Sequence, residues 1–221
     1  RPTRAGLRQA AHAGTPLLLR TVTLRIGILL AAWVAGGLGT VALAGHQVVA
    51  AVWNLAAFAL DALAIAAQAL VGQALGAGDL TAARAVLRRT LQWGVGAGVA
   101  LGAVLAVGAG AVGPLFTPDA AVRAAVATAL LVTAAGLPMA GWVFVLDGVL
   151  IGAGDGRFLA WAGVVTLAAY APLAVAVRSL APDGGPGLAW AWLAYAGAFI
   201  GARALTTGLR ARGSAWMTLG A

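Results

Sequence analysis

The chain has 221 residues, of which 62% are hydrophobic and only 9% are charged, against about 25% in soluble domains. Its charged side chains are arginines and aspartates, with no lysine and no glutamate. This composition cannot cover a water-facing surface, so it excludes a soluble domain and makes the lipid bilayer a partner. The net charge of +8 does not indicate nucleic-acid binding, because the arginines stand between long apolar runs instead of gathering on one polar face.

Long charge-free runs predict six transmembrane helices. Residues 26–78 hold a single charged residue, Asp61, and as one helix they would measure about 80 Å, against a hydrocarbon core of roughly 30 Å. The segment must therefore fold back, and the glycine cluster at 36–40 is its best turn signal. The predicted helices cover roughly residues 20–38, 43–74, 90–113, 123–150, 158–179 and 187–208.

The runs are expected to be helices because lipid cannot hydrogen-bond an open backbone, so the predicted fold class is an all-α membrane protein. Six spans place twelve of the fourteen arginines, Arg203 among them, on one side of the membrane. Basic loops favour the cytoplasm, so both termini are predicted to be cytoplasmic, in a bacterial plasma membrane. Because the sequence starts with Arg1 and not with Met, we expect it to begin inside a longer protein.

One polar line marks the second span. Gln47, Asn54, Asp61 and Gln68 follow each other at seven-residue intervals, and a step of seven returns to nearly the same helix face, with about 20° of drift. Asp61 lies near the middle of the span, where an ionised carboxylate costs about 2.5–3.5 kcal/mol on insertion scales. Two interpretations stand. The line borders a transport pathway in which Asp61 binds a proton or a cationic group, or it is a hydrogen-bonded packing seam between helices.

Other polar and small residues of the spans have simpler interpretations. Asp147 lies about one turn before the end of the fourth span, where it is a pathway candidate but is better explained as a capped or water-bonded helix end. His46 is expected to be solvated at the membrane interface. A ridge of small residues at four-residue spacing predicts close helix packing and consists of Gly94, Gly98, Gly102, Ala106 and Gly110.

The sequence offers little for enzyme chemistry. It contains no cysteine, and its two histidines stand far apart, with no nucleophile or metal-ligand pattern around either. We therefore predict no catalytic site, no metal site and no bound cofactor. The candidate residues of a substrate or ion pathway are Gln47, Asn54, Asp61, Gln68 and Asp147.

Two runs of the sequence are specific enough to compare with known families. The first is AGHQV at residues 44–48 together with LDALAIAAQALVGQALGAGD at 60–79, and the second is FVLDGVLIGAGD at 144–155. Both resemble the multidrug and toxic compound extrusion (MATE) transporters, specifically their DinF-like branch. The resemblance implies a twelve-helix protein in two six-helix lobes, with residues 1–221 as the C-terminal lobe and an N-terminal six-helix lobe as its partner.

By this resemblance, the whole protein would export organic cations or other amphipathic toxic compounds in exchange for protons or sodium, by alternating access through a cavity between the lobes. One alternative is a flippase for lipids or polysaccharide precursors, which would need cationic side chains in its cavity for pyrophosphate. Arg20 and Arg25 are the candidates, and both are expected to snorkel to the membrane surface. An alternative of another class is a structural membrane protein without transport activity.

Overall fold

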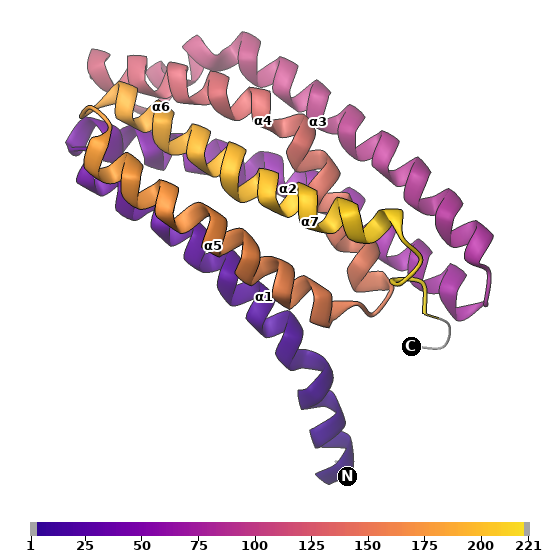
Figure 1. Ribbon diagram of the computed structural model, residues 1–221. Helices are drawn as coiled ribbons and strands as arrows, with labels where there is room; N and C mark the ends of the chain where they lie inside the picture. The colour runs from indigo at the N-terminus through magenta and orange to yellow at the C-terminus, as the bar shows by residue number, and fades with distance from the viewer. Residues whose placement is uncertain (1–3, 219–221) are drawn as a thin grey trace.

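A computed structural model describes residues 4–218, and every regular element in that range is a helix (Figure 1). The elements in chain order are α1 (Arg4–Gly37), α2 (Thr40–Gly76), α3 (Leu80–Phe116), α4 (Ala120–Gly152), α5 (Gly156–Leu180), α6 (Gly185–Ala194), the π-helical turn η1 (Tyr195–Ile200) and α7 (Gly201–Arg212). Six stretches are long and apolar enough to cross a bilayer, and the last joins α6, η1 and α7. This confirms the predicted all-α class with six spans.

Short turns separate the spans, and the first of them lies at the predicted glycine cluster. Four of these turns contain a glycine with positive φ, namely Gly39 (94°), Gly78 (76°), Gly154 (73°) and Gly184 (77°). A side chain is strained in this left-handed region, so these positions favour glycine. The turn residue Asp79 also starts α3, because its carboxylate accepts a hydrogen bond at 2.8 Å from the backbone N–H three residues later.

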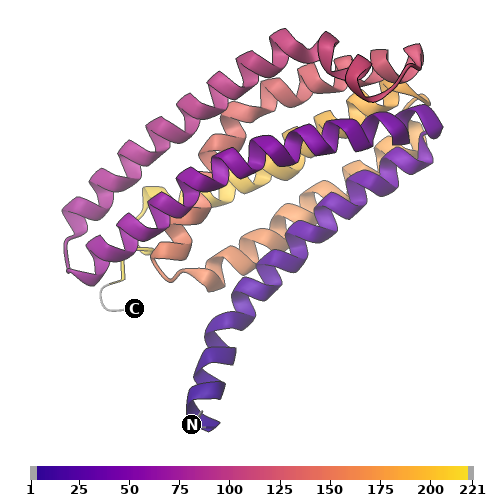
Figure 2. The same cartoon turned by 180° about the vertical axis from the view of Figure 1, so that it is seen from behind.

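The helices form two groups that meet along α4 and the last span (Figure 1). In one group α4 packs closely against α2 and α3, and in the other α1 runs beside α5. The last span packs against both α4 and α5. Helices α1 and α2 meet near their connecting turn and then diverge toward the opposite end of the bundle, as Figure 2 shows. The two groups are therefore held together mainly through α4 and the last span.

Glycines bring the backbones of α3 and α4 close together. Gly94, Gly98 and Gly102 are buried on α3. A Cβ atom added to Gly102 would lie 2.6 Å from the carbonyl oxygen of Ala134, and one added to Gly94 would lie 2.7 Å from that of Gly141. Such distances leave no room for any side chain. The predicted packing role is confirmed for this half of the small-residue ridge.

The prediction is wrong for the other half of the ridge, because Ala106 and Gly110 are exposed. A four-residue step turns about 40° beyond one full helix turn, so a ridge with this spacing winds off the contact face. The buried positions pass instead to Leu105, Ala109 and Gly113. The contact with α4 thus continues along α3, but on different residues from those the spacing indicated.

A π-helical turn and a series of aromatic rings occupy the middle of the last span. Within the turn, the rings of Tyr195 and Phe199 stack with centroids 5.1 Å apart. π-Helical turns are rare and occur frequently at functional sites. In α6, Trp192 packs against His46 with ring centroids 5.7 Å apart. The prediction of a solvated His46 is wrong, because α6 covers that end of α2 and buries the imidazole.

The chain after α7 folds back onto the bundle. Trp216 is buried and belongs to a small core with residues of α2, α3 and α4. Its indole Nε1 donates hydrogen bonds to the carbonyl oxygens of Ala211 and Gly213 at 3.2 and 3.1 Å. Arg210 forms a salt bridge with Asp155 of the α4–α5 turn at 2.7 Å. The end of the last span is thereby tied to this turn.

Candidate functional site

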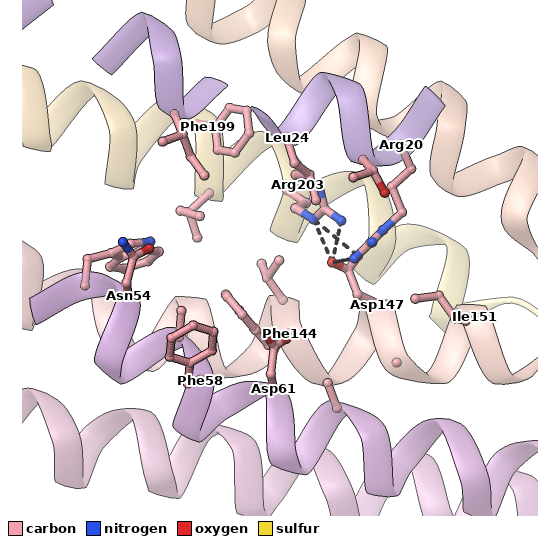
Figure 3. A pocket seen from close by; sticks show the side chains of 18 of the residues that line it. Arg20, Leu24, Asn54, Phe58, Asp61, Phe144, Asp147, Ile151, Phe199 and Arg203 are labelled. Carbon is pink, nitrogen blue, oxygen red and sulfur yellow. Dashed lines mark hydrogen bonds and ion pairs between the residues drawn. The ribbon is translucent and has the colours of Figure 1, made fainter. Parts of the chain in front are cut away.

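A pocket of about 510 Å³ lies between α1, α2, α4 and the η1–α7 part of the last span. Volumes in this range are typical of small-molecule sites. Of the described helices, α3 and α5 contribute no lining residue. The wall combines aromatic and aliphatic side chains with a charged group at one end (Figure 3). The diverging pair α1 and α2 therefore borders the pocket, whereas the glycine contact between α3 and α4 lies away from it.

The charged end of the pocket is built around Asp147 of α4. Arg203 of α7 donates from Nε to both carboxylate oxygens, at 3.0 and 3.2 Å, and from Nη2 to Oδ2. Arg20 of α1 donates from Nη2 to the same Oδ2 at 3.0 Å. Figure 3 shows the two guanidinium groups converging on this one carboxylate. A single aspartate thus joins three helices that are far apart in the sequence.

This arrangement corrects three predictions. Asp147 is not a water-bonded helix end, because it is 7% exposed and its partners are guanidinium groups of other helices. The charge count predicts Arg203 at the cytoplasmic surface, but it is 3% exposed and binds Asp147. Arg20 turns inward to Asp147 instead of snorkelling, and Arg25 also lines the pocket. The common cause is that buried charges are stabilised by opposite charges, which only the packing of distant helices brings within reach.

The sequence holds one signal for Arg203. Tyr195, Phe199 and Arg203 are spaced by four residues, so on a helix they lie near one face, and all three line the pocket. For Arg20 we find no such signal, because its partner Asp147 is 127 positions away. The contact between Arg20 and Asp147 depends on how α1 packs relative to α4, which the sequence does not indicate.

Only part of the polar line of α2 lines the pocket. Asn54, Asp61 and Gln68 line it, and Gln47 does not. Gln47 is exposed and lies nearer the α1–α2 turn, where the two helices are still close together. The structure thus brings four of the five candidate residues together, with Asp147 facing the three polar residues of α2 from α4.

Asp61 faces the pocket without an ion pair. Its side chain is exposed, and none of the salt bridges among residues 4–218 includes it. The pocket therefore presents one carboxylate that two arginines neutralise, Asp147, and one that is accessible, Asp61. Within the described residues, no group of three or more histidine, cysteine, aspartate or glutamate side chains is placed to hold a metal ion.

The two arginines that bind Asp147 retain unused hydrogen-bond donors. Arg20 Nε and Arg203 Nη1 are buried, and neither has a hydrogen-bond partner in the described part of the chain. A buried donor without a partner costs about 1–3 kcal/mol. With one carboxylate between two guanidinium groups, this end of the pocket also carries an excess positive charge.

Six spans, four of which line a pocket of small-molecule size, define a multi-pass membrane protein with a solute-sized site. Residues 16–176, more than half of the chain, match the model of the MatE family. The chain therefore belongs to the MatE family, the multidrug and toxic compound extrusion proteins, whose members are transporters and not enzymes. The family resemblance of the two sequence runs is confirmed.

Plant proteins are among the relatives. Over 157 residues, the chain is 36% identical to "Protein DETOXIFICATION 44, chloroplastic" of Arabidopsis thaliana, an alignment that covers 71% of this chain and 30% of that protein. It is 32% identical over 151 residues to "Protein DETOXIFICATION 43" of the same plant, covering 68% of this chain and 29% of that protein. The chain thus spans less than a third of the length of these relatives.

Solved transporter structures share the fold. The structure "MATE in complex with MaL6" superposes with a TM-score of 0.83 at 18% identity, covering 96% of this chain and 47% of that chain. A MOP superfamily transporter from Pyrococcus furiosus, described as having a binding pocket of reverse polarity, superposes with a TM-score of 0.75 at 19% identity, covering 89% and 42%. Identities this low establish the fold alone. The six helices correspond in size to about half of such a transporter.

Proposed function

We propose that this chain is the C-terminal lobe of a MATE-type secondary active transporter of the DinF-like branch. A second six-helix lobe would complete the other wall of the pocket. Together the lobes would export small amphipathic compounds by alternating access, in exchange for protons or sodium. The observation that carries the proposal is the pocket itself, which lies between diverging helices and combines apolar walls with an accessible carboxylate, Asp61.

Asp61 is the proposed site for the coupling proton or for a cationic group. Its carboxylate is exposed to the pocket and has no ion pair among the described residues. Asp147 is occupied by Arg20 and Arg203, so its proposed role is to position these two guanidinium groups. The organic-cation substrates expected from the sequence depend on Asp61 and stay a prediction.

The substitution Asp61→Asn in the whole transporter tests this role. The assay follows efflux from proteoliposomes of two fluorescent probes that stay charged at every working pH, 2-anthracenesulfonate and trimethyl(2-anthryl)ammonium. We expect an imposed pH gradient to drive at least one probe, and Asp61→Asn to lower the gradient-dependent rate at least tenfold. The matched control is Asp183→Asn, an exposed aspartate in the α5–α6 turn, which should leave the rate unchanged.

Two results would contradict the proposal in different ways. Unchanged efflux with unchanged pH dependence in Asp61→Asn would reduce this aspartate to helix packing. No movement of either probe under any gradient would contradict the transport proposal and favour the alternative of a structural membrane protein.

The flippase alternative gains one observation, because Arg20, Arg25 and Arg203 all line the pocket. Asp61 and Asp147 line it as well, so with all five groups ionised only one positive charge is in excess. A pyrophosphate head group carries more than one negative charge and would need several cations to balance it. The pocket therefore matches a singly charged solute better than a lipid-linked pyrophosphate.

The sidedness of the protein is also a proposal. We place both termini, together with the α2–α3 and α4–α5 turns, in the cytoplasm, because these turns carry or adjoin Arg84, Arg88, Arg89 and Arg157. The bacterial plasma membrane stays a prediction, since the relatives named above are plant proteins and one of them is named chloroplastic.

A further inference from the structure

The charges of the pocket narrow the class of solute. We propose that Arg20 and Arg203, held by Asp147, form the head-group site for organic monoanions, namely compounds with one carboxylate or sulfonate on an apolar, mainly aromatic body. This inference rests on the proposed transport function and specifies its substrate.

The first step is the charge imbalance. Asp147 carries one negative charge and binds two guanidinium groups, which always carry a positive charge in proteins. The group lies inside a helix bundle that spans the membrane, where an uncompensated charge is costly. One further anion would balance it. Asp61, the other carboxylate of the pocket, forms no ion pair with either arginine in the described chain, so the balancing position is open to a solute.

The second step is the supply of donors. Arg20 is the point of first contact, because its side chain is 19% exposed against 4% for Arg203. Its Nη2 binds Asp147, and its Nε has no partner among the described residues. Nη1 of Arg203 is likewise unpartnered and lies deeper. Charged hydrogen bonds from a guanidinium group to an oxyanion are among the strongest in proteins, and the planar donor set matches carboxylate geometry.

The third step is the apolar part of the site. Figure 3 shows the arginine–aspartate group at one end of the pocket and Asn54 toward the other, with the rings of Phe58, Phe144 and Phe199 between them. Aromatic walls of this kind bury flat apolar bodies and add ring-to-ring contacts. A monoanion would therefore place its head group at the arginines and its body among the phenylalanine rings.

A cation is a poorer match to the same end of the pocket. The carboxylate there, Asp147, already has two positive partners, and a third cation beside it would be repelled by both. Arg25 on the same wall adds further positive charge. A cationic solute would have to rely on Asp61 alone.

Three probes that share one ring system test the inference by equilibrium binding to the purified whole transporter. They are 2-anthracenesulfonate (anionic), 2-anthracenesulfonamide (neutral) and trimethyl(2-anthryl)ammonium (cationic), all followed by anthracene fluorescence. We expect the sulfonate to bind at least tenfold more tightly than the sulfonamide, and the cation to bind most weakly. Because the body is constant, the ratios report the head-group site alone.

Two substitutions with opposite expected signs separate a charge effect from a loss of folding. Arg20→Gln should weaken sulfonate binding at least tenfold and leave sulfonamide binding within twofold, whereas Arg20→Lys should restore part of the loss. Asp147→Asn removes the competing negative charge and should tighten sulfonate binding, measured below the unfolding temperature of the variant. The matched control is Arg84→Gln, an exposed arginine of α3 that does not line the pocket.

The inference is overturned if the cation binds more tightly than the sulfonate, or if Arg20→Gln weakens sulfonate and sulfonamide equally. In either case gradient-driven movement of the cationic probe would leave the transport proposal intact, so the two failures are distinguishable. Displacement of the sulfonate by vesicles that contain a lipid-linked pyrophosphate, but not by soluble aromatic carboxylates, would also overturn it, in favour of the flippase alternative.

Discussion

Two neighbouring helix pairs, each joined by a short turn, differ in how they pack. Helices α3 and α4 stay in contact because Gly94, Gly98 and Gly102 place no side chain between the backbones. Helices α1 and α2 diverge, and their facing residues at the pocket are large or polar, such as Arg20 and Phe58. The difference shows that side-chain size decides which pair forms a closed wall and which one borders a solute site.

The largest expected effect comes from breaking the ionic contact that holds the diverging side together. Asp147→Ala would leave the Arg20 and Arg203 guanidinium groups buried without a counter-charge, a change that costs about 3–5 kcal/mol. The thermal unfolding midpoint in detergent should fall by about 10 °C. The control is Asp155→Ala, which removes the more exposed salt bridge to Arg210 and should cost about 0–1 kcal/mol. Equal shifts for both variants would contradict a central role for the Asp147 group.

A somewhat smaller effect is expected from adding a side chain between α3 and α4. A Cβ at Gly98 would meet the backbone carbonyl of Leu137, whereas a Cβ at Gly96 would meet nothing within 4 Å. Gly98→Val should therefore destabilise the protein by about 1–3 kcal/mol through overpacking, and Gly96→Val should not overpack. The readout is the unfolding midpoint of the two variants side by side. Valine is a better helix former than glycine, so a loss at Gly96→Val as large as that at Gly98→Val would contradict close approach as the reason for the glycines.

Cysteine labelling on α2, the least disruptive of these changes, tests which face of that helix is in contact with water. The chain contains no cysteine, so single substitutions can be labelled cleanly. Ile65 and Leu55 are both exposed on α2, but only Ile65 lines the pocket. Ile65→Cys should react at least tenfold faster than Leu55→Cys with a charged methanethiosulfonate reagent, because such reagents need water. Equal rates would mean that the pocket is not an aqueous site, or that Leu55 does not face lipid.

The spans and turns were predictable because the signals for them are local. Gly78 and Asp79 illustrate this, since a left-handed glycine and a capping aspartate act within one helix turn of their own position. Three residues of the α2 polar line reached the pocket for a similar reason, because helix periodicity fixes their common face. Gln47 did not, because the pocket occupies only part of the length of α2, and nothing local marks where it ends.

The ionic part of the site could not be read from the sequence. Arg203 and Arg20 meet Asp147 across 56 and 127 positions, and the charge-counting rule that orients loops treats all arginines alike. His46 shows the same limit, since whether α6 covers it depends on the packing of a distant helix. In each case the missing information was the identity of the neighbouring helix.

The π-helical turn at Tyr195–Ile200 has a consequence for how the chain tolerates changes in length. A π-turn accommodates one more residue than an α-turn does, so losing a single codon between Ala196 and Ala198 would convert it to regular helix. Because the π-turn absorbs its extra residue within one turn, α7 would keep its facing, with Arg203 still on the pocket side and Trp216 on its packing surface. The same loss inside the regular helix α7 would instead rotate everything after it by about 100°, so the π-helical turn is a place where the last span can change its length by one residue and keep its site geometry.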